Sequence, residues 1–126
     1  MDKRDNLIGG QWVAGDRYTP NISPSNLGDT IAEFAQGDTA QVEQAVAAAT
    51  AAFPAWSTGG IQARFDALDR IGSEILARKE ELGTLLAREE GKTKAEAIGE
   101  AARAGQIFRF FAGECLRLAG ESLPSV

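Results

Sequence analysis

The sequence predicts an α/β chain in which a β-hairpin and short strands come first and about four helices follow. Two short apolar runs flank a Gly-Gly pair near the start, and a stretch rich in proline, asparagine and serine comes after them. From residue 38 onward, apolar residues recur at the three- and four-residue spacing of helices that face a core. We therefore expect a single incomplete domain over residues 1–126, with short strands and a connector over residues 1–37 and a helical part over residues 38–126.

The strand region divides at its glycines and prolines. The Gly-Gly pair suits the positive φ angles of a two-residue turn, so residues 6–13 are predicted to form a β-hairpin. Residues 15–28 are typical of a turn-rich connector, in which Ile22 could be a strand residue between two prolines. Residues 29–35 predict a third short strand. Three short strands leave unpaired edges, which need partners from elsewhere.

Two helices are predicted between residues 38 and 78. Asp38 is a suitable N-cap for the first helix, and Pro54 should end it. Ser57 or Thr58 should cap the second helix, which runs to about Arg78. The apolar stripes are Val42, Val46, Ala49 and Phe53 in the first helix, and Ile61, Phe65, Leu68, Ile71 and Ile75 in the second.

A helix end and a helix start meet at Gly91. The third helix should cover residues 81–90, because Gly91 suits the left-handed conformation of a helix C-cap. Thr93 and Glu96 then form the Thr-x-x-Glu pattern of a capping box, in which each side chain bonds a backbone N–H that would otherwise lack a partner. This pattern predicts the start of a fourth helix.

The fourth helix should run from Lys94 to about Ala119 and is apolar on two sides. One face is Ile98, Ala102, Gly105, Phe108, Ala112, Cys115 and Leu116, and the other is Ile107, Phe110, Phe111 and Leu118. The small residues of the first face would let another backbone approach closely. A helix that is apolar on two sides is normally buried on two sides, so more chain or a partner should cover the second face.

Composition and charge exclude several classes of function. The 13 basic and 18 acidic residues give a net charge of −5 with no basic run, so nucleic acid is not an expected partner. No apolar run reaches bilayer length and no signal peptide begins the chain, so we expect a cytoplasmic protein with no membrane partner. Because the chain has no histidine, it has no Ser-His-Asp or Cys-His nucleophile and no histidine zinc site.

Two nucleotide-binding motifs are rejected by their spacing. Gly91, Lys92 and Thr93 resemble the end of a phosphate-binding P-loop, but the first glycine of that pattern would fall on Leu86, inside a predicted helix. The Gly-Gly pairs of the chain lack the Gly-x-Gly-x-x-Gly spacing of a dinucleotide site. The segment therefore predicts neither a triphosphate site nor a dinucleotide site.

The reactive side chains of the helical part each have a structural interpretation. Cys115 lies within a helix and has no base nearby in sequence, so a buried structural cysteine is favoured over a nucleophile. Glu89 and Glu90 are adjacent and point in different directions, which favours capping or solvated roles over paired catalysis. Arg103 stands beside apolar residues and could bind a carboxylate through two hydrogen bonds, but an ion pair with Glu100 is favoured.

The order of short motifs resembles the N-terminal segment of the aldehyde dehydrogenase family across essentially the whole chain. The motifs are Ile-Gly-Gly-Gln-Trp-Val at 8–13, Ile-Ser-Pro-Ser at 22–25, Ala-Val-Ala-Ala-Ala-Thr-Ala-Ala-Phe-Pro-Ala-Trp at 45–56, Arg64, Glu-Glu-Gly-Lys-Thr at 89–93, Gly-Glu-Ala-Ala-Arg at 99–103 and Phe-Phe-Ala-Gly-Glu at 110–114. The last two look most like the branch that oxidises 2-oxoglutarate semialdehyde (2,5-dioxopentanoate).

The resemblance implies part of an aldehyde dehydrogenase-like cofactor-binding domain, from a parent several times longer than this chain. Such enzymes oxidise an aldehyde to a carboxylic acid with NAD or NADP and form homodimers or homotetramers. A cysteine thiolate attacks the aldehyde, hydride passes to the nicotinamide, and a glutamate-activated water releases the acid. These catalytic groups lie beyond this chain, and Cys115 does not match the nucleophile motif, so the chain alone is expected to be inactive.

Two binding features of the family map onto this chain. The fourth helix resembles the one that lines the substrate tunnel, which makes Arg103 a candidate for binding the far carboxylate of a semialdehyde acid. Many members also hold a monovalent cation through a backbone carbonyl and an acidic side chain, and these positions fall on Ile22 and Glu89. A different hypothesis is a stand-alone helical protein-interaction module, which would bind a partner through the second apolar face of the fourth helix.

Overall fold

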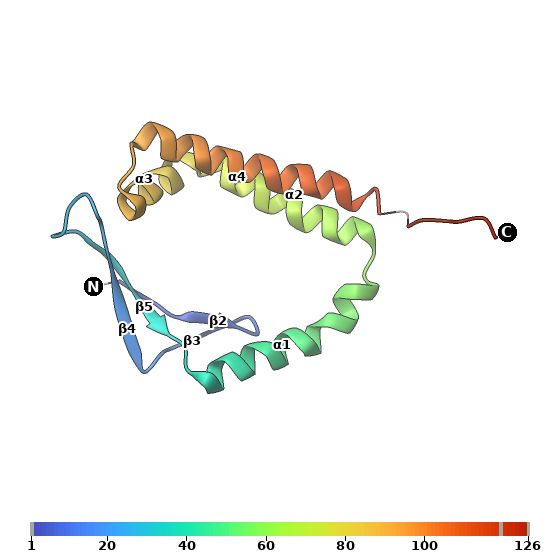
Figure 1. Ribbon diagram of the computed structural model, residues 1–126, viewed down its shortest axis with the longest axis horizontal. Helices are drawn as coiled ribbons and strands as arrows, with labels where there is room; N and C mark the ends of the chain where they lie inside the picture. Colours follow the sequence, from blue (N-terminus) through green and yellow to red (C-terminus); the bar gives the residue numbers. More distant parts are fainter. Residues whose placement is uncertain (1, 119, 126) are drawn as a thin grey trace. The chain divides into compact units, whose positions relative to one another are not determined.

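The computed structural model describes residues 2–118 and 120–125, in which strands come first and helices follow (Figure 1). This order confirms the predicted α/β chain with a hairpin and short strands before four helices. The chain divides into two compact units, Met1–Thr58 with Leu85–Thr93, and Gly59–Thr84 with Lys94–Val126. The expected single incomplete domain stays a prediction.

The first unit contains a three-stranded sheet and a separate hairpin. β1 (Lys3–Arg4) runs parallel to β5 (Thr30–Gln36), and β4 (Arg17–Ile22) pairs antiparallel with the other side of β5. β2 (Asn6–Ile8) and β3 (Gln11–Val13) form the predicted hairpin. The two glycines of its turn have φ angles of +57° and +80°, the positive values that a type I′ turn requires.

The connector expected over residues 15–28 instead contains β4, a strand with a proline inside it. Pro20 pairs with Glu33, and the Glu33 N–H donates to the Asp2 carbonyl on the opposite side of β5, at 2.9 Å. Pro20 therefore occupies a pair without hydrogen bonds between β4 and β5, where its missing N–H removes no bond from the ladder. Composition indicated turns here, but pairing with β5 decided the conformation.

Helix α1 (Thr39–Thr58) begins where it is predicted and continues past its proline. The Asp38 carboxylate accepts a hydrogen bond from the Gln41 backbone N–H at 2.8 Å, which is an N-cap contact. The expected end at Pro54 is wrong, because the hydroxyls of Ser57 and Thr58 donate to the Pro54 carbonyl and complete another turn. Pro54 has no N–H to donate to the carbonyl four residues earlier in the helix. All 20 residues of α1 are described and none is buried, so the loss of this hydrogen bond disturbs no packed interface.

Helix α2 (Ile61–Ala77) begins without the predicted cap, and its predicted stripe is only partly covered: Ile61 and Ile71 are each 42% exposed, and the buried residue of the helix is Gly72. Ser57 and Thr58 belong to α1, so Gly60 takes the N-cap position with an extended backbone and no side-chain hydrogen bond. The helix ends one residue before Arg78, as expected. The two hydroxyl residues therefore end the first helix and do not cap the second.

Helix α3 (Lys79–Glu90) begins two residues before the predicted start. Arg78 bonds both carboxylate oxygens of Glu81 at 2.9 and 2.6 Å, which supports the first turn. Gly91 ends the helix as predicted, with φ of +74° and its N–H donating to the Ala87 carbonyl at 2.9 Å. Residues with a Cβ rarely adopt this φ, so the glycine fixes the end of the helix.

Helix α4 (Lys94–Cys115) packs along α2 in the second unit, and the two helices lie side by side in Figure 1. Glycines allow the close approach: a Cβ on Gly105 would lie 2.8 Å from Leu76 Cγ and 3.0 Å from the Gly72 carbonyl oxygen. The buried residues of α4 are Ala97, Ala101, Gly105 and Ala112. The predicted face of small residues is thus confirmed at Gly105 and Ala112. In the first half of the helix the buried residues are Ala97 and Ala101, each one position before the predicted Ile98 and Ala102.

The end of α4 is earlier than predicted. The helix stops at Cys115, and the Arg117 N–H donates to the Glu114 carbonyl at 2.9 Å, the three-residue spacing of a tight final turn. The predicted end near Ala119 lies outside the described residues. The capping box expected at the start of α4 stays a prediction.

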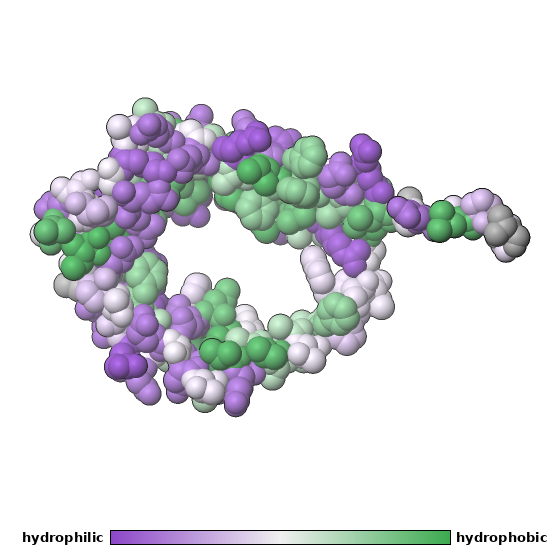
Figure 2. Space-filling model, viewed as in Figure 1, coloured by the Kyte–Doolittle hydropathy of each residue, from purple (hydrophilic) through white to green (hydrophobic). Residues whose placement is uncertain are grey.

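Both units keep large apolar side chains at their surfaces. Figure 2 shows apolar atoms gathered along α1 and along α4, and among the described residues no large side chain is completely buried. Phe53 on α1 is 66% exposed and Phe110 on α4 is 64% exposed. The second apolar face predicted for the last helix is therefore present and uncovered in this chain. No helix among residues 2–118 and 120–125 is both long enough and apolar enough to span a membrane.

Candidate functional site

The first candidate site lies where the last turn of α3 meets β4. The Asn21 side-chain amide donates a 2.8 Å hydrogen bond from Nδ2 to Glu89 Oε1, and the Glu89 side chain is half-buried. Asn21 immediately precedes Ile22, so the structure brings the two predicted cation-site residues, Ile22 and Glu89, to the same junction although they are far apart in sequence. Their role as ligands stays a prediction.

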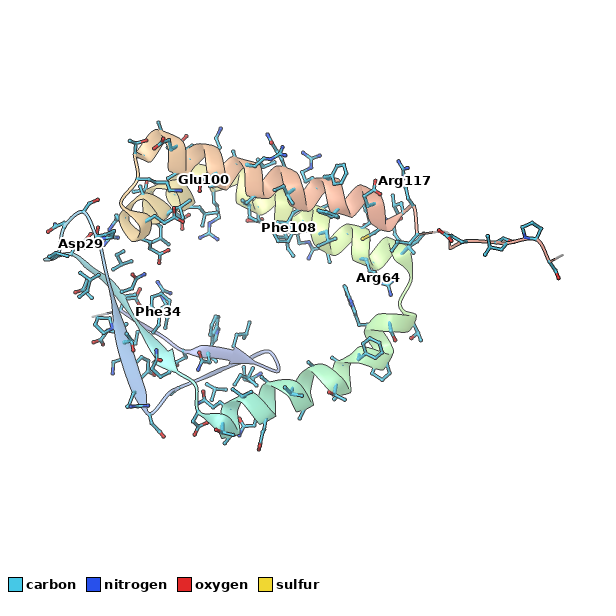
Figure 3. The ribbon with its side chains drawn as sticks, viewed as in Figure 1. Asp29, Phe34, Arg64, Glu100, Phe108 and Arg117 are labelled. Carbon is cyan, nitrogen blue, oxygen red and sulfur yellow. The ribbon has the colours of Figure 1, made fainter. Side chains whose placement is uncertain are left out.

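Two further contacts hold the end of α3 against the turn that joins β4 to β5. Arg88 bonds both carboxylate oxygens of Asp29 at 2.9 and 2.7 Å, and the hydrogen bonds from Arg88 hold the pKa of the Asp29 carboxyl below its ordinary value. Figure 3 labels Asp29 at this turn. A Cβ on Gly91 would lie 2.9 Å from both Pro24 Cγ and Ser25 Oγ. Contacts of the residue before Glu89 and of the glycine two residues after it therefore fix the position of Glu89.

The backbone of β4 determines where the Ile22 carbonyl points. The Ser23 N–H donates to the Asp29 carbonyl at 2.9 Å, so Ser23 faces the β5 side of the sheet, and Pro20 occupies a pair without ladder bonds. Because the backbone groups of successive strand residues point to alternate sides, the Ile22 carbonyl faces away from β5. In the described sheet β4 is an edge strand, so this carbonyl is directed out of the ladder.

The donor atoms at this junction suit a hard monovalent cation. A main-chain carbonyl and a carboxylate are both oxygen ligands, the type that hard cations prefer. Glu89 also lies in the last turn of α3, where the partial negative charge of the helix end favours a cation. The described residues contain no group of three or more acidic, cysteine or histidine side chains that could hold a metal ion. The residues present therefore fit a monovalent cation better than a transition metal.

The second candidate site is a hollow on the side of α4 that faces away from α2. It has a volume of about 320 Å³ and is lined by Arg103, Gln106, Ile107, Phe110 and Phe111. The rings of Phe110 and Phe111 meet edge to face, with centroids 5.3 Å apart. The predicted neighbours of Arg103 are thus brought together with it, and an exposed guanidinium stands at one end of an aromatic surface.

This hollow can bind an organic anion that carries a short apolar chain. A guanidinium can donate two parallel hydrogen bonds to a carboxylate, and the phenylalanine rings offer an apolar wall for methylene groups. Figure 3 labels Phe108 on the opposite side of the same helix, toward α2, which shows that the two faces of α4 serve different contacts. The predicted ion pair between Arg103 and Glu100 stays a prediction.

Other predicted features have different outcomes. Cys115 is half-buried rather than buried, because it occupies the last position of α4, where the packing against α2 ends. Glu90 forms an ion pair with Lys92, in agreement with a structural role. Asn21 and Asp29 were not among the predicted site residues: Asn21 belongs to the predicted connector, and Asp29 begins the predicted third strand. The sequence carried no signal that they contact α3.

The sequence predicts no dinucleotide site in this chain. Such a site needs a glycine-rich loop between a strand and a helix, where backbone N–H groups bind the pyrophosphate. The described glycines with positive φ are Gly9, Gly10, Gly91 and Gly120, which lie in a hairpin turn, after a helix and in the C-terminal tail. None of these described glycines lies in a loop between a strand and a helix, and the absence of cofactor-binding residues from this segment stays a prediction.

Comparison with known proteins gives a consistent result. The model of the aldehyde dehydrogenase family matches residues 12–126. An alpha-ketoglutaric semialdehyde dehydrogenase of Bacillus subtilis is 37% identical over 126 residues, which cover 95% of this chain and 25% of the relative. A mitochondrial succinate-semialdehyde dehydrogenase of Arabidopsis thaliana is 35% identical over 119 residues, which cover 94% of this chain and 22% of the relative.

Solved structures agree with the sequence relatives. A variant of 1-pyrroline-5-carboxylate dehydrogenase from Thermus thermophilus superposes with a TM-score of 0.92 and 28% identity, covering 98% of this chain and 25% of that one. An NAD-dependent benzaldehyde dehydrogenase from Corynebacterium glutamicum superposes with a TM-score of 0.89 and 34% sequence identity. The match covers 100% of this chain and 28% of that protein. The chain thus spans about a quarter of the length of the proteins it matches.

Proposed function

Because this chain belongs to the aldehyde dehydrogenase family, we propose that it is the N-terminal part of an NAD(P)-dependent enzyme that oxidises an acidic semialdehyde to a dicarboxylate. The observation that carries the proposal is the extent of the match: nearly the whole chain aligns, but with only 22% and 25% of two relatives that are named for semialdehydes. The catalytic groups would come from the rest of the parent, so the 126-residue chain by itself is inactive.

The uncovered apolar faces support a role as part of a larger protein. Phe53 on α1 and Phe110 on α4 are both mostly exposed, and large exposed apolar surfaces usually mark contacts with other protein. In the parent enzyme, the remaining chain and neighbouring subunits of a homodimer or homotetramer would cover them. The composition supports a cytoplasmic location for that assembly.

The hollow on α4 supports an acidic substrate. Arg103 would bind the carboxylate at the far end of the substrate, and the aromatic wall beside it would contact the methylene groups. This arrangement favours semialdehydes that carry a second carboxylate over neutral aldehydes, and 2-oxoglutarate semialdehyde is the candidate that the relative from Bacillus subtilis suggests. Both assignments apply to the parent enzyme.

The cofactor would be bound outside this segment. NAD or NADP, when bound, accepts the hydride that leaves the aldehyde carbon. The residues of this chain would hold the far end of the substrate and form one wall of its tunnel, while the parts that this chain lacks would place the reacting carbon.

A monovalent cation would bind between the Ile22 carbonyl and the Glu89 carboxylate. We expect Glu89→Ala to remove the stabilisation of the parent enzyme by potassium, because it removes the charged ligand. The measurement is the thermal midpoint Tm in potassium chloride and in N-methylglucamine chloride at equal ionic strength. Glu90→Ala is the matched control and should keep the response, since Glu90 pairs with Lys92. An undiminished potassium response in Glu89→Ala would contradict the site.

The coding sequence beyond Val126 tests the function as a whole. We expect it to continue into Pro-Trp-Asn, Glu-Leu-Gly-Gly and Gly-Gln-x-Cys segments, and the complete product to reduce NAD⁺ or NADP⁺ when given 2-oxoglutarate semialdehyde. The 126-residue chain should show no reduction in the same spectrophotometric assay. A stop codon directly after Val126 would overturn the proposal and favour the stand-alone interaction module, which should unfold cooperatively by itself.

A further inference from the structure

The hydrogen bond between Asn21 and Glu89 connects two segments that are 68 residues apart. We propose that Asn21 is a positioning residue for the cation site: its amide holds the Glu89 carboxylate beside the Ile22 carbonyl. The inference rests on the cation site of the proposed function, but it assigns a role to a residue that is not itself a ligand.

The geometry of β4 allows one strand to supply both the carbonyl and the group that orients the carboxylate. Asn21 pairs with Ala32 across the sheet, and the register shifts between Asn21 and Ile22. Successive side chains of a strand point to opposite faces, so Asn21 reaches Glu89 on one face while the Ile22 side chain lies on the other, 44% exposed. The Ile22 carbonyl is directed away from β5, and the preceding residue of the same strand bonds the Glu89 carboxylate.

A carboxylate in this position needs a group that orients it. Glutamate has several rotatable bonds, and a carboxylate in the last turn of a helix is repelled by the partial negative charge of the helix end. The Asn21 amide occupies Oε1 of Glu89 and leaves Oε2 available. Fixing one oxygen in advance lowers the conformational entropy that an ion must remove when it binds, which raises its affinity.

A purely structural role for Asn21 makes a different prediction. The end of α3 is also held by the two Arg88–Asp29 bonds and by the close contact of Gly91 with Pro24. If Asn21 served only to dock the helix, breaking the neighbouring Arg88–Asp29 pair should affect cation binding as much as removing Asn21 does. If Asn21 positions the ligand, only its own replacement should weaken cation binding.

The experiment compares the potassium affinity of the full-length enzyme and its variants. The half-saturating potassium concentration is obtained from the rise in Tm during a potassium chloride titration at constant ionic strength. We expect Asn21→Leu and Asn21→Ala to raise this concentration about tenfold, which corresponds to one lost hydrogen bond. Asp29→Asn, the matched control, should lower Tm without potassium but leave the half-saturating concentration within about twofold of the wild-type value.

The outcomes separate this inference from the function on which it rests. If Asn21→Leu keeps the wild-type half-saturating concentration, or if Asp29→Asn raises it equally, the positioning role is overturned while the cation site stands. If the wild-type enzyme shows no potassium response, or Glu89→Ala retains it, the cation site itself fails and the positioning role fails with it. A tenfold change confined to the Asn21 variants supports the inference.

Discussion

Gly83→Ala is expected to lower the free energy of unfolding by about 2–3 kcal/mol, the usual size of an overpacking effect. Gly83 is the buried residue of α3, and a Cβ there would lie 2.6 Å from Ile98 Cα and 2.7 Å from the Ile98 backbone nitrogen. These atoms belong to the main chain of α4, so a side-chain rotation cannot relieve the overlap. The measurement is urea-induced unfolding of the purified protein, followed by circular dichroism.

Gly99→Ala is the matched control for this prediction. Gly99 follows Ile98 in the same helix, and a Cβ at this position would meet no atom within 4 Å. Alanine is the better helix former by about 1 kcal/mol, so Gly99→Ala should stabilise the protein slightly. The opposite signs of the two changes would separate close helix packing from helix propensity. A Gly83→Ala protein as stable as the wild type would show that α3 and α4 do not pack this closely.

Arg103→Ala in the full-length enzyme is expected to reduce kcat/KM for 2-oxoglutarate semialdehyde about 10- to 100-fold. A hydrogen bond to a charged group contributes about 1.5–3 kcal/mol, and each 1.4 kcal/mol is about a factor of ten. For a neutral aldehyde such as benzaldehyde the change should stay within about threefold, because that substrate has no far carboxylate. Steady-state kinetics with both substrates provide the measurement.

Two controls define what Arg103 contributes. Arg103→Lys keeps the charge but not the paired donors, so it should restore only part of the activity toward the acidic substrate. Arg117→Ala removes an arginine whose side chain is 77% exposed and which pairs with Glu114, and it should leave both substrates unaffected. Equal losses for acidic and neutral aldehydes in Arg103→Ala would rule out carboxylate binding by this residue.

Local signals in the sequence predicted most of the elements. The glycine pair before Gln11 gave the hairpin, Asp38 gave the start of α1, and Gly91 gave the end of α3, because each rests on a backbone preference that acts within a few residues. The same reasoning failed at Pro54 and over residues 15–28. At Pro54, hydroxyls three and four residues on complete another turn of the helix, whereas Pro20 is accommodated by the pairing of β4 with the distant strand β5.

The candidate sites show a similar division. The hollow on α4 could be predicted around Arg103 because helical periodicity alone places residues three, four and seven positions apart on one face. Asn21 could not be found in this way, because its partner Glu89 belongs to a helix far along the chain. Sequence spacing contains no information about which strand residue a distant helix end will meet.

By itself, the sequence determined the element types, the two apolar faces of the last helix and the family to which the chain belongs. These follow from periodicity, turn residues and the order of motifs, which are properties of short segments. Only the tertiary structure decided that β4 is an edge strand, that Gly83 and Gly105 bring helices into close contact, and that Asn21 bonds Glu89. The physical reason is that strand pairing, helix packing and long-range hydrogen bonds each depend on atoms from two segments whose meeting neither segment encodes alone.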